Sequence, residues 1–408
     1  MIDTDVLVVG AGPTGLALAT RLRRAGHEPF VAERLAEGQN TSRAAVVHAH
    51  TLEALGELGI AERMMAEGMP IANFCIRDGD RLLARMSFDR LPSRYACLLM
   101  IPQDTTEAIL RDAHAAAGGE VHWGHTVTAL RDVAGGVQAT LETPEGPKVI
   151  RARYVVGADG MHSIVRNAVD VEFEGSSYEE SFVLADVQMR WPLRADEVAL
   201  YFSPRGVLVV APLPRGRFRI VATCEEAPPR PGVDTIQSIL DERGPAGAHV
   251  ETVFWSSRFR LHHRLAKRYR AGRMLLMGDA AHVHSPAGGQ GMNTGLVDAC
   301  VLGRMLDEVL SGREPDAFLD HYERLRRPAA KKVLSLAGRL TSAAMLRHPV
   351  KRAVRNLVFR IVGSLPFTRR RIEMNLSGLS RREHARVPGL DGAPLRDTGA
   401  LAVAAKAG

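Results

Sequence analysis

Cysteines are few in this sequence, and they are scattered. Its 408 residues contain four, with no C-x-x-C pair among them: Cys75, Cys97, Cys224 and Cys300. This arrangement argues against a disulfide framework and against a zinc site, and it favours reduced thiols in the cytoplasm. His48 and His50 are the other candidate metal ligands, but no nearby Cys, Asp or third His completes a site around them. We therefore expect no bound metal.

Long apolar runs and a leader peptide are also lacking. No uncharged apolar stretch approaches the roughly 18 residues that a membrane span needs. Residues 1–10 are predicted to form a strand and not a signal peptide, because they lack a basic leader and a long apolar run. The formal net charge of +7 is spread along the chain, without the basic and aromatic stripe typical of nucleic-acid binding. The sequence therefore predicts a cytoplasmic protein that neither spans a membrane nor binds nucleic acid.

The chain does have a glycine-rich turn in an informative setting. An apolar strand, Asp5 to Val9, leads into the turn at residues 10–15, and a helical pattern follows. Gly10 permits the tight turn, Gly12 lets a pyrophosphate approach the backbone, and Gly15 lets helix and strand pack closely. A second strand ends at Glu33, where a carboxylate can hold the hydroxyls of an adenosine ribose. An acid at this position favours FAD or NAD over NADP, whose extra phosphate it would repel.

A second stretch of the same kind lies much later, between Met274 and Gly295. A short apolar strand runs into Gly278-Asp279, then into a loop rich in Pro and Gly, and a helical pattern begins near Gly291. Asp279 is placed to accept hydrogen bonds from a ribose or ribityl hydroxyl, and the loop glycines leave room for a flat ligand on the backbone. The positive helix end suits a ligand that gains negative charge on reduction. Taken alone, the stretch is equally compatible with a plain corner between strand and helix.

Three further positions fit the same ligand less specifically. Asp159-Gly160 follows a short buried strand and repeats the pattern of an acid at a strand end beside glycine, with Ser163 and Arg166 after it. Arg43 could place a guanidinium against a phosphate or a flavin edge, or it could be a solvated arginine near a helix cap. Gln103 begins a predicted helix, where it could hydrogen-bond a cofactor or cap the helix.

Together these motifs resemble the three fingerprints of the class A flavoprotein monooxygenases, the para-hydroxybenzoate hydroxylase type. The matching elements are residues 10–15 with Glu33, Asp159-Gly160 with Ser163 and Arg166, and Gly278-Asp279 with Pro286 and Gly291. Their order and separations match over roughly residues 3–330. The resemblance implies a mixed α/β fold with a discontinuous Rossmann-like FAD-binding domain and an inserted antiparallel-sheet substrate domain. The expected segments are 1–180 and 261–330 for FAD, 181–260 for substrate, a helical region 331–398, and a disordered tail 399–408.

The resemblance also assigns roles to single residues. Arg43 and Pro286 would be the catalytic positions, with Pro286 beside the reacting face of the flavin. Asp159 would serve both FAD and NAD(P)H, and Val127 would lie by the adenine. The full set of implied cofactor-binding positions is Gly10, Gly12, Pro13, Thr14, Gly15, Glu33, Arg34, Arg43, Gln103, Val127, Asp159, Asp279, Pro286, Gly289, Gly291, Met292 and Asn293.

The implied activity is oxygen transfer by a monomer or homodimer. NADPH or NADH would reduce FAD, O2 would add to give a C4a-hydroperoxide, and one oxygen atom would pass to an electron-rich carbon, by hydroxylation or epoxidation. Only one dinucleotide fingerprint is present, which fits a family in which NAD(P)H has no Rossmann domain of its own. Many polyketide hydroxylases of the family carry a further thioredoxin-like domain, and we expect none after Asp391.

The expected substrate is largely apolar. With Gly206 placed in register with the strand turn of the small phenolic-acid hydroxylases, the positions of their carboxylate-binding arginine and phenol-relay tyrosine fall near Leu213 and Ala199. An apolar pocket predicts a polycyclic aromatic, indole, terpenoid or polyketide-type substrate without an essential carboxylate. Tyr201 and His284 are candidate polar contacts beside Leu213, although their residue types favour a surface tyrosine and a loop histidine.

The C-terminal region is predicted to be helical and basic, with breaks at Pro349 and Pro366. A basic amphipathic stretch can lie on a membrane surface. We expect instead that it packs against the cofactor domain, because its apolar residues need cover: Leu334, Leu336, Leu340, Leu357, Val358 and Ile361.

Three rival functions share parts of this pattern. A flavin halogenase would carry a W-x-W-x-I-P signature, but Trp123, Trp191 and Trp255 are isolated. A reductase of the geranylgeranyl type would reduce its substrate without stoichiometric oxygen consumption. A non-catalytic flavoprotein would bind an aromatic ligand without accelerating NAD(P)H oxidation.

Overall fold

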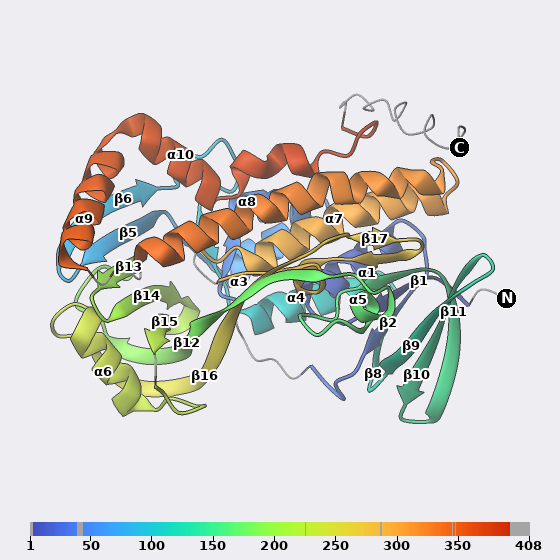
Figure 1. The fold of residues 1–408 in the computed structure, drawn as a ribbon, viewed down its shortest axis with the longest axis horizontal. Helices are drawn as coiled ribbons and strands as arrows, with labels where there is room; N and C mark the ends of the chain where they lie inside the picture. The colour runs from blue at the N-terminus through green and yellow to red at the C-terminus, as the bar shows by residue number, and fades with distance from the viewer. Residues whose placement is uncertain are drawn as a thin grey trace, which may run out of the picture.

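The computed structural model describes residues 3–38, 44–224, 226–285, 288–344, 346 and 348–391. The fold is mixed α/β, as predicted, with two large sheets and a bundle of C-terminal helices across one side (Figure 1). Within the part of the chain that the structure describes, none of the helices has the length and apolar character that crossing a bilayer requires. The predicted tail at 399–408 lies outside the described residues.

The first sheet is built on a parallel core. Its central strand, β1 (Thr4–Val9), is almost entirely buried. A parallel strand that is covered by helices on both faces is shielded from water on both sides, which is why its sequence is a continuous apolar run. β1 pairs in parallel with β2 and β11, and the strand order is β17-β18-β11-β1-β2-β8. The strands are β2 (Pro29–Glu33), β8 (Val121–Trp123), β9 (Thr126–Val133), β10 (Gly136–Thr143), β11 (Gly146–Gly157), β17 (Arg270–Ala271) and β18 (Met274–Leu276), with β9 and β10 joined antiparallel to β11.

Helices connect and cover this sheet. α1 (Pro13–Arg24) and α7 (Gly291–Leu310) lie beside each other, so the two glycine-rich stretches that begin them meet at one side of the sheet (Figure 1). The other helices of this part are α2 (Ala49–Gly56), α3 (Ala61–Glu67), α4 (Gln103–Ala116) and α5 (Ile164–Ala168), and a small sheet has the order β3 (Val46–His48), β7 (Leu98–Met100), β4 (Met69–Ile71).

The second sheet has the order β19-β16-β12-β15-β14-β13-β5-β6. Two 18-residue strands, β12 and β16, pair along their length and run out from the cofactor-binding part. The expected boundary at residue 181 misses β5 and β6, because β5 comes from early in the chain and pairs in parallel with β13. The strands are β5 (Asn73–Asp78), β6 (Arg81–Ser87), β12 (Phe173–Arg190), β13 (Glu197–Ser203), β14 (Gly206–Leu213), β15 (Arg217–Cys224), β16 (His249–Ala266) and β19 (His282–Val283).

The two faces of the second sheet have different partners. A helix that the sequence did not predict, α6 (Val233–Arg243), covers one face with Ile236, Ile239 and Leu240. Side chains alternate along β13, so Ala199 and Tyr201 pack with the α6 cluster, whereas Val198 and Leu200 point to the opposite face. That opposite face, turned toward the C-terminal helices, carries the apolar lining described below.

Three helices form the C-terminal region: α8 (Asp320–Ala344), α9 (Pro349–Ser364) and α10 (Pro366–Leu376). α9 and α10 begin at the two predicted prolines, which suit the first position of a helix. Leu334 is buried against the core, but Leu357, Val358 and Ile361 are exposed, so the expectation that these three would be covered was wrong. Short 3-10 turns complete the chain: η1 (Pro214–Gly216), η2 (Gly278–Ala280), η3 (Asp316–Leu319) and η4 (Leu379–Ala385).

Candidate active site

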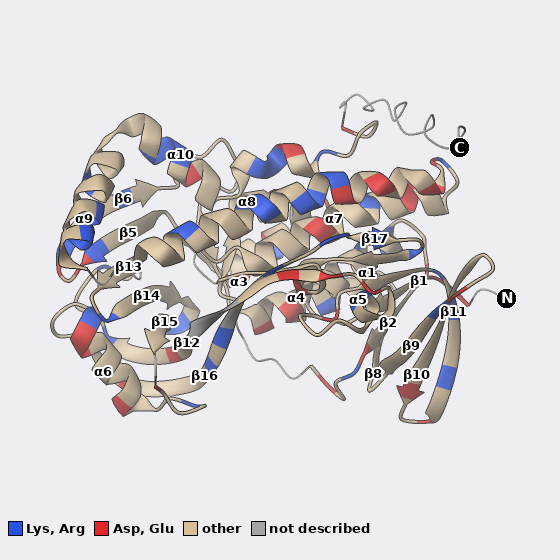
Figure 2. Cartoon of the chain, in the orientation of Figure 1, with Lys and Arg blue, Asp and Glu red and all other residues tan. Residues whose placement is uncertain are grey.

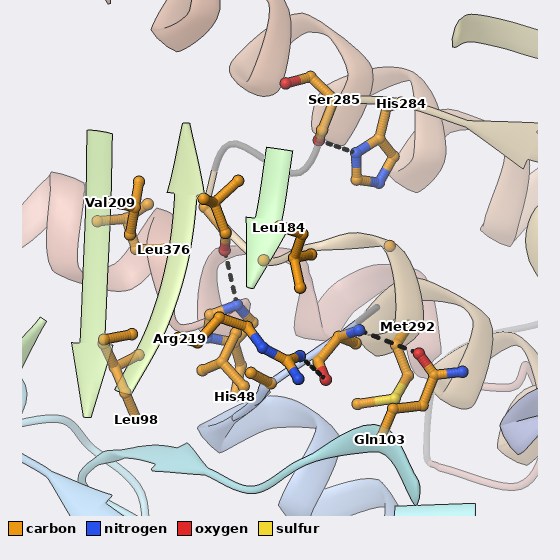
Figure 3. Close-up of a pocket in the computed structure, with 18 of the residues that line it drawn as sticks. His48, Leu98, Gln103, Leu184, Val209, Arg219, His284, Ser285, Met292 and Leu376 are labelled. Carbon is orange, nitrogen blue, oxygen red and sulfur yellow. Dashed lines mark hydrogen bonds between the residues drawn. The ribbon is translucent and has the colours of Figure 1, made fainter. Parts of the chain in front are cut away.

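One cavity of about 810 Å³ joins the glycine-rich turns of the first sheet to the apolar face of the second. Ten of the predicted site residues line it, and they come from all parts of the chain named above: Gly12, Pro13, Thr14, Glu33, Gln103, Asp279, His284, Gly289, Gly291 and Met292. Figure 3 shows part of this lining, with Gln103, Met292 and His284 among the labelled side chains. Folding thus brings together positions that are up to 280 residues apart in the sequence.

The glycine turn at residues 10–15 is tightly packed at Gly10 and Gly15 and open to the cavity at Gly12. A Cβ on Gly15 would lie 1.9 Å from the carbonyl oxygen of Gly10, and Gly10 itself has a φ of +102°. At Gly12, which lines the cavity, a Cβ would meet no atom within 4 Å. No side chain caps the start of α1, so the first N–H groups of the helix remain directed at this open space. The turn therefore offers a cradle for an anionic group.

The carboxylate of Glu33 is held over this turn. Oε2 accepts a hydrogen bond from the Ala11 N–H at 2.8 Å, and Oε1 accepts one from the Leu35 N–H at 3.0 Å. Two other predicted cofactor contacts do not reach the cavity: Arg34 is exposed outside it, and Val127 is buried in the core of the first sheet.

A helix face that the sequence analysis did not single out extends the cavity beyond Glu33. Gln103, Glu107 and Arg111 are spaced four residues apart on α4, which puts them on one side of the helix, and all three line the cavity with Trp123. The Gln103 Nε2 group donates to Glu107 Oε1 at 2.8 Å, and burial raises the pKa of the Glu107 carboxyl. The spacing i, i+4, i+8 from Gln103 is the signal that could have identified them.

Gln103 and Arg219 hold the backbone of Ala44 from both sides. The Ala44 N–H donates to Gln103 Oε1 at 3.0 Å, and Nη1 of Arg219 donates to the Ala44 oxygen at 2.7 Å (Figure 3). Arg219 also forms a two-pronged ion pair with Asp186, at 2.6 and 2.7 Å. Ala44 follows Arg43 directly, but Arg43 and Pro286, the two predicted catalytic residues, lie outside the described residues.

Asp159 lies just outside the cavity and hydrogen-bonds the backbone at the start of α5. Asp159 Oδ2 accepts from the Ile164 N–H at 2.7 Å, Oδ1 is buried with no hydrogen-bond partner in the part of the chain that the structure describes, and burial raises the pKa of this carboxyl. Its neighbours Ala158 and Gly160 line the cavity, whereas Asp159 itself does not. Arg166 connects this motif to the later one, because its Nη1 donates to the Ala280 oxygen at 3.0 Å.

A buried ion cluster supports the turn that carries Asp279. Asp298 accepts from the Gly278 N–H at 3.2 Å, from His282 Nε2 at 2.7 Å and from Arg326 Nε at 2.7 Å. Burial alone would raise the pKa of the Asp298 carboxyl, but Arg326 and His282 hold that pKa below its ordinary value. The turn is thus fixed from below, and Asp279 faces the cavity. Asp298 and Arg326 belong to no recognisable motif, and neither was predicted as a site residue from the sequence.

The glycine loop before α7 is fastened by Asn293. Asn293 Oδ1 accepts from the His48 N–H at 2.7 Å, and Nδ2 donates to the oxygens of Val46 at 2.9 Å and Gly289 at 2.7 Å. Asn293 does not line the cavity itself, although it was predicted to touch the cofactor. A Cβ on Gly289 would lie 2.2 Å from Val46 Cγ1, so β3 and the loop are in close contact. Asn293 therefore shapes the loop from below.

The far half of the cavity is apolar. Its walls come from β5, β6 and β7, from the cavity-facing side of β12 to β15, and from α8 to α10; they include Ile76, Met86, Leu98, Leu184, Leu200, Val209, Phe359 and Leu376. The cationic side chain of Arg219 at this wall is neutralised by Asp186. The other polar side chains of this wall include the neutral Thr341 and Asn375, together with Arg260 and His262 of β16.

His284 has a defined proton arrangement at the junction of the two halves. Its Nδ1 lies 2.8 Å from the Ser285 carbonyl oxygen, so Nδ1 carries the hydrogen and Nε2 is left as an acceptor. Burial lowers the pKa of His284 to about 4, which keeps the ring neutral at physiological pH. Nε2 has no partner among the described residues and lies 3.9 Å from the Cβ position of Gly291.

The other two predicted substrate contacts lie elsewhere. Tyr201 is fully buried on the α6 side of β13, with its ring edge toward Trp191, because strand alternation turns it away from the cavity. Leu213 shares a cluster with cavity-lining residues but does not line the cavity.

Comparisons with known proteins agree with this geometry. The family described as FAD binding domain matches residues 3–337. The chain is 37% identical over 345 residues to the 12-dehydrotetracycline 5-monooxygenase/anhydrotetracycline 6-monooxygenase of Streptomyces rimosus, a match spanning 81% of this chain and 68% of that protein. The p-nitrophenol 4-monooxygenase structure from Pseudomonas putida aligns with a TM-score of 0.85 at 25% identity, covering 97% of this chain and 99% of that one. A ternary complex of aklavinone-11 hydroxylase with FAD and aklavinone aligns with a TM-score of 0.73 at 27% identity, over 85% of this chain and 70% of that one.

Proposed function

The chain belongs to the FAD binding domain family and is an FAD-dependent monooxygenase of class A, and from this premise we propose its substrate and its reductant. The proposed substrate is an apolar polycyclic aromatic compound of polyketide type. The proposed reaction inserts one oxygen atom of O2 into that compound and reduces the other to water, with NADPH or NADH as the donor of the two electrons. The observation that carries this proposal is the continuity of the dinucleotide cradle with an apolar cavity.

The residues present fit FAD. The open space above Gly12 at the start of α1 would take the pyrophosphate, Glu33 would hold the adenosine ribose, and Asp279 would hold the ribityl chain. The flavin would then lie along the start of α7, at Gly291 and Met292. When bound, FAD supplies the redox chemistry, accepting electrons from the nicotinamide and delivering them to O2.

The protein's own residues orient the substrate, stabilise the charge of the reduced flavin and exclude water from the site. The N-terminus of α7 directs a positive dipole at the place where negative charge develops on reduction. The apolar walls around Leu184 and Leu200 exclude water from the place of oxygen transfer. Nε2 of His284 is an acceptor for a phenolic O–H, and this hydrogen bond would orient the ring and raise its electron density.

The lining supports a substrate without a carboxylate. A buried carboxylate needs a buried cation that is free to pair with it, but the Arg219 guanidinium is already paired with Asp186, and Arg260, the other arginine that the second sheet adds to the lining, is exposed. Aliphatic and aromatic side chains from both sheets and from α8 to α10 suit fused rings. The names of the relatives are consistent with this class, since one acts on anhydrotetracycline and another is bound to aklavinone.

The test is to measure NADH, NADPH and O2 consumption by the yellow protein with a panel of anthracycline-like, angucycline-like, indole, terpenoid and simple phenol compounds under ¹⁸O2. The proposal expects that a fused-ring phenol accelerates both consumptions and yields a product with one ¹⁸O atom. Flavin reduction without ¹⁸O in any product would contradict the proposal and favour a reductase or a binding protein. Coupled turnover only with simple phenols would overturn the substrate class alone.

A further inference from the structure

The outer face of α9 is an uncovered apolar stripe. Its side chains and the first residues of α10 are between 48% and 79% exposed, and they form the longest run of exposed large hydrophobic residues among those described: Val350, Val354, Leu357, Val358, Ile361, Leu365 and Phe367. The intervals along α9 follow the helical repeat, so the five of these side chains that belong to α9 share one face. Contiguous apolar surface of this kind marks an interaction site.

The opposite face of α9 belongs to the cavity. Phe359, Val362 and Gly363 line the cavity, and Arg355 is buried on the same inner side. α9 is therefore apolar on two faces, one packed on the protein and one directed outward. The helix lies at one end of the long axis of the molecule, and the β9 to β11 meander lies at the other (Figure 1).

The segment that carries the stripe is basic, and the carboxylates beside it, Asp78 and Glu373, are paired with Arg352, Arg369 and Arg370. Residues 349–372 contain seven Lys or Arg and no Asp or Glu, and Figure 2 shows no acidic segment along α9. Lys351, Arg360 and Arg371 are exposed, and their side chains have no ion pair or hydrogen bond among the described residues. At about 100° per residue, Lys351 and Arg360 lie on opposite flanks of the stripe. One cation thus lies on each flank of the apolar face.

We infer that the α9–α10 face docks on the surface of an anionic lipid bilayer. An amphipathic helix with a broad apolar face and flanking cations lies in the plane of a bilayer, with the apolar side chains among the acyl chains and the cations at the phosphates. A second copy of the chain fits less well. Pairing two identical stripes would bring Lys351, Arg360 and Arg371 of both copies together, and no acidic residue of the segment would neutralise them.

Docking would place the substrate cavity beside the membrane, because the inner face of α9 is a cavity wall. An apolar fused-ring compound partitions into a bilayer, so its path to the site would pass α9 or α10. The path of the substrate from the bilayer to the cavity rests on the proposed function, whereas the docking of the α9–α10 face does not.

The experiment is co-sedimentation of the full FAD-loaded chain with phosphatidylcholine vesicles that contain or lack phosphatidylglycerol. Binding is expected only with the anionic vesicles, and added salt should weaken it. Leu357→Ser with Ile361→Ser should lower the partition coefficient by roughly tenfold or more, because two half-exposed aliphatic side chains no longer enter the bilayer. Lys351→Gln with Arg360→Gln should lower it and reduce its dependence on salt. Val149→Ser, on an equally exposed position of β11 in the distant meander, is the matched control and should bind like the wild type.

Thermal unfolding and flavin content of each variant establish that it is folded. The inference is overturned if the wild type does not bind anionic vesicles, or if the stripe variant binds as well as the Val149→Ser control. It is also overturned if light scattering shows a dimer that the stripe substitutions dissociate, which would assign the face to a second copy. Capture of an acidic protein in place of vesicles would overturn it likewise. Vesicle binding without coupled turnover would retain the docking and contradict only the proposed function.

Discussion

The backbone N–H of His48 donates a 2.7 Å hydrogen bond to the side-chain oxygen of Asn293, 245 residues later in the chain. The same amide donates from Nδ2 to the Val46 and Gly289 oxygens. Asn293 therefore uses its acceptor and both donor hydrogens to fasten β3 against the glycine loop. This junction, together with Asp298 beneath the Asp279 turn, holds the two ends of the loop before α7 in register.

Asn293→Asp is expected to weaken this junction, because a carboxylate would oppose two carbonyl oxygens to which the amide donates. Unsatisfied buried groups of this kind cost about 1–3 kcal/mol, so FAD affinity should fall roughly ten- to a hundredfold. Fluorescence titration of the apoprotein with FAD measures the change. Asn167→Asp, at an exposed position of α5, is the control and should leave affinity unchanged. Equal affinity of both variants would contradict a supporting role for Asn293.

Gly12→Ala and Gly15→Ala separate cofactor binding from folding. The new methyl at Gly12 meets no atom within 4 Å, so the unfolding midpoint of the apoprotein should not change, while FAD binding should fall because the methyl occupies the pyrophosphate space. The new methyl at Gly15 would lie 1.9 Å from the Gly10 oxygen, so this variant should be destabilised even without FAD. Flavin absorbance and urea unfolding distinguish the two. A Gly12→Ala protein with full flavin content would remove the basis for placing the pyrophosphate there.

Acid should destabilise the protein well before its carboxylates are protonated. Burial lowers the pKa of His48 to about 4, of His50 to about 3 and of His284 to about 4, whereas each is near 6.5 when unfolded. Below pH 6.5 the unfolded chain therefore binds more protons, and stability falls with pH down to the folded pKa values. Each histidine contributes up to about 1.4 kcal/mol per pH unit. His50→Gln should flatten the decline in the free energy of unfolding between pH 6.5 and 5; an unchanged slope would show that His50 is not buried in its neutral form.

Removing the charge of Asp298, the carboxylate of the buried ion cluster beneath the Asp279 turn, is expected to destabilise the fold. Asp298→Asn would leave the Arg326 guanidinium buried without a counter-charge, which costs about 3–5 kcal/mol when a buried pair is broken. Urea unfolding measures this loss, and flavin content should fall with it because Gly278 loses its anchor. Asp196→Asn, which breaks an ion pair with Arg194 on the surface, should leave the midpoint unchanged. A fully stable Asp298→Asn protein would contradict the assigned role.

His284→Phe tests the acceptor at the cavity. The substitution removes Nε2, so kcat/KM for a phenolic substrate should fall by roughly a hundredfold, as is common when a positioned acceptor of a proton is lost. The methyl ether of the same compound cannot donate a hydrogen bond, and its binding affinity should change little. His284→Gln restores an acceptor and should recover part of the activity. Flavin content serves as the control for folding. Equal losses with phenol and ether would assign His284 to packing.

Much of the cofactor half could be predicted from the sequence, because its signals are local. A glycine with a positive φ, such as Gly10, or with no room for a side chain, such as Gly15, must be glycine wherever the chain goes afterwards. Glu33 is the last residue of β2 and Asp279 lies three residues after the end of β18, so their places near the strand ends follow from the strands themselves. The prolines at positions 349 and 366 likewise begin helices by their own backbone geometry.

The substrate half depended on contacts that no local pattern records. Tyr201 and Leu200 are adjacent, and only the pairing of β13 with β14 and β5 decides which one faces the cavity. Asp298 and Arg326 become a pair only when α7 and α8 pack, so neither is marked in the sequence.

The exposed stripe of α9 has the same origin. Its apolar spacing predicts that one face will be buried, but a helix with two apolar faces leaves the choice to the tertiary structure. The sequence by itself determined the cofactor motifs and the helix boundaries at proline, because these follow from backbone sterics and short-range spacing; the mixed fold was implied by the resemblance that those motifs carry. Only the tertiary structure decided which apolar faces enclose the cavity and which remain outside, because that depends on the packing of segments hundreds of residues apart.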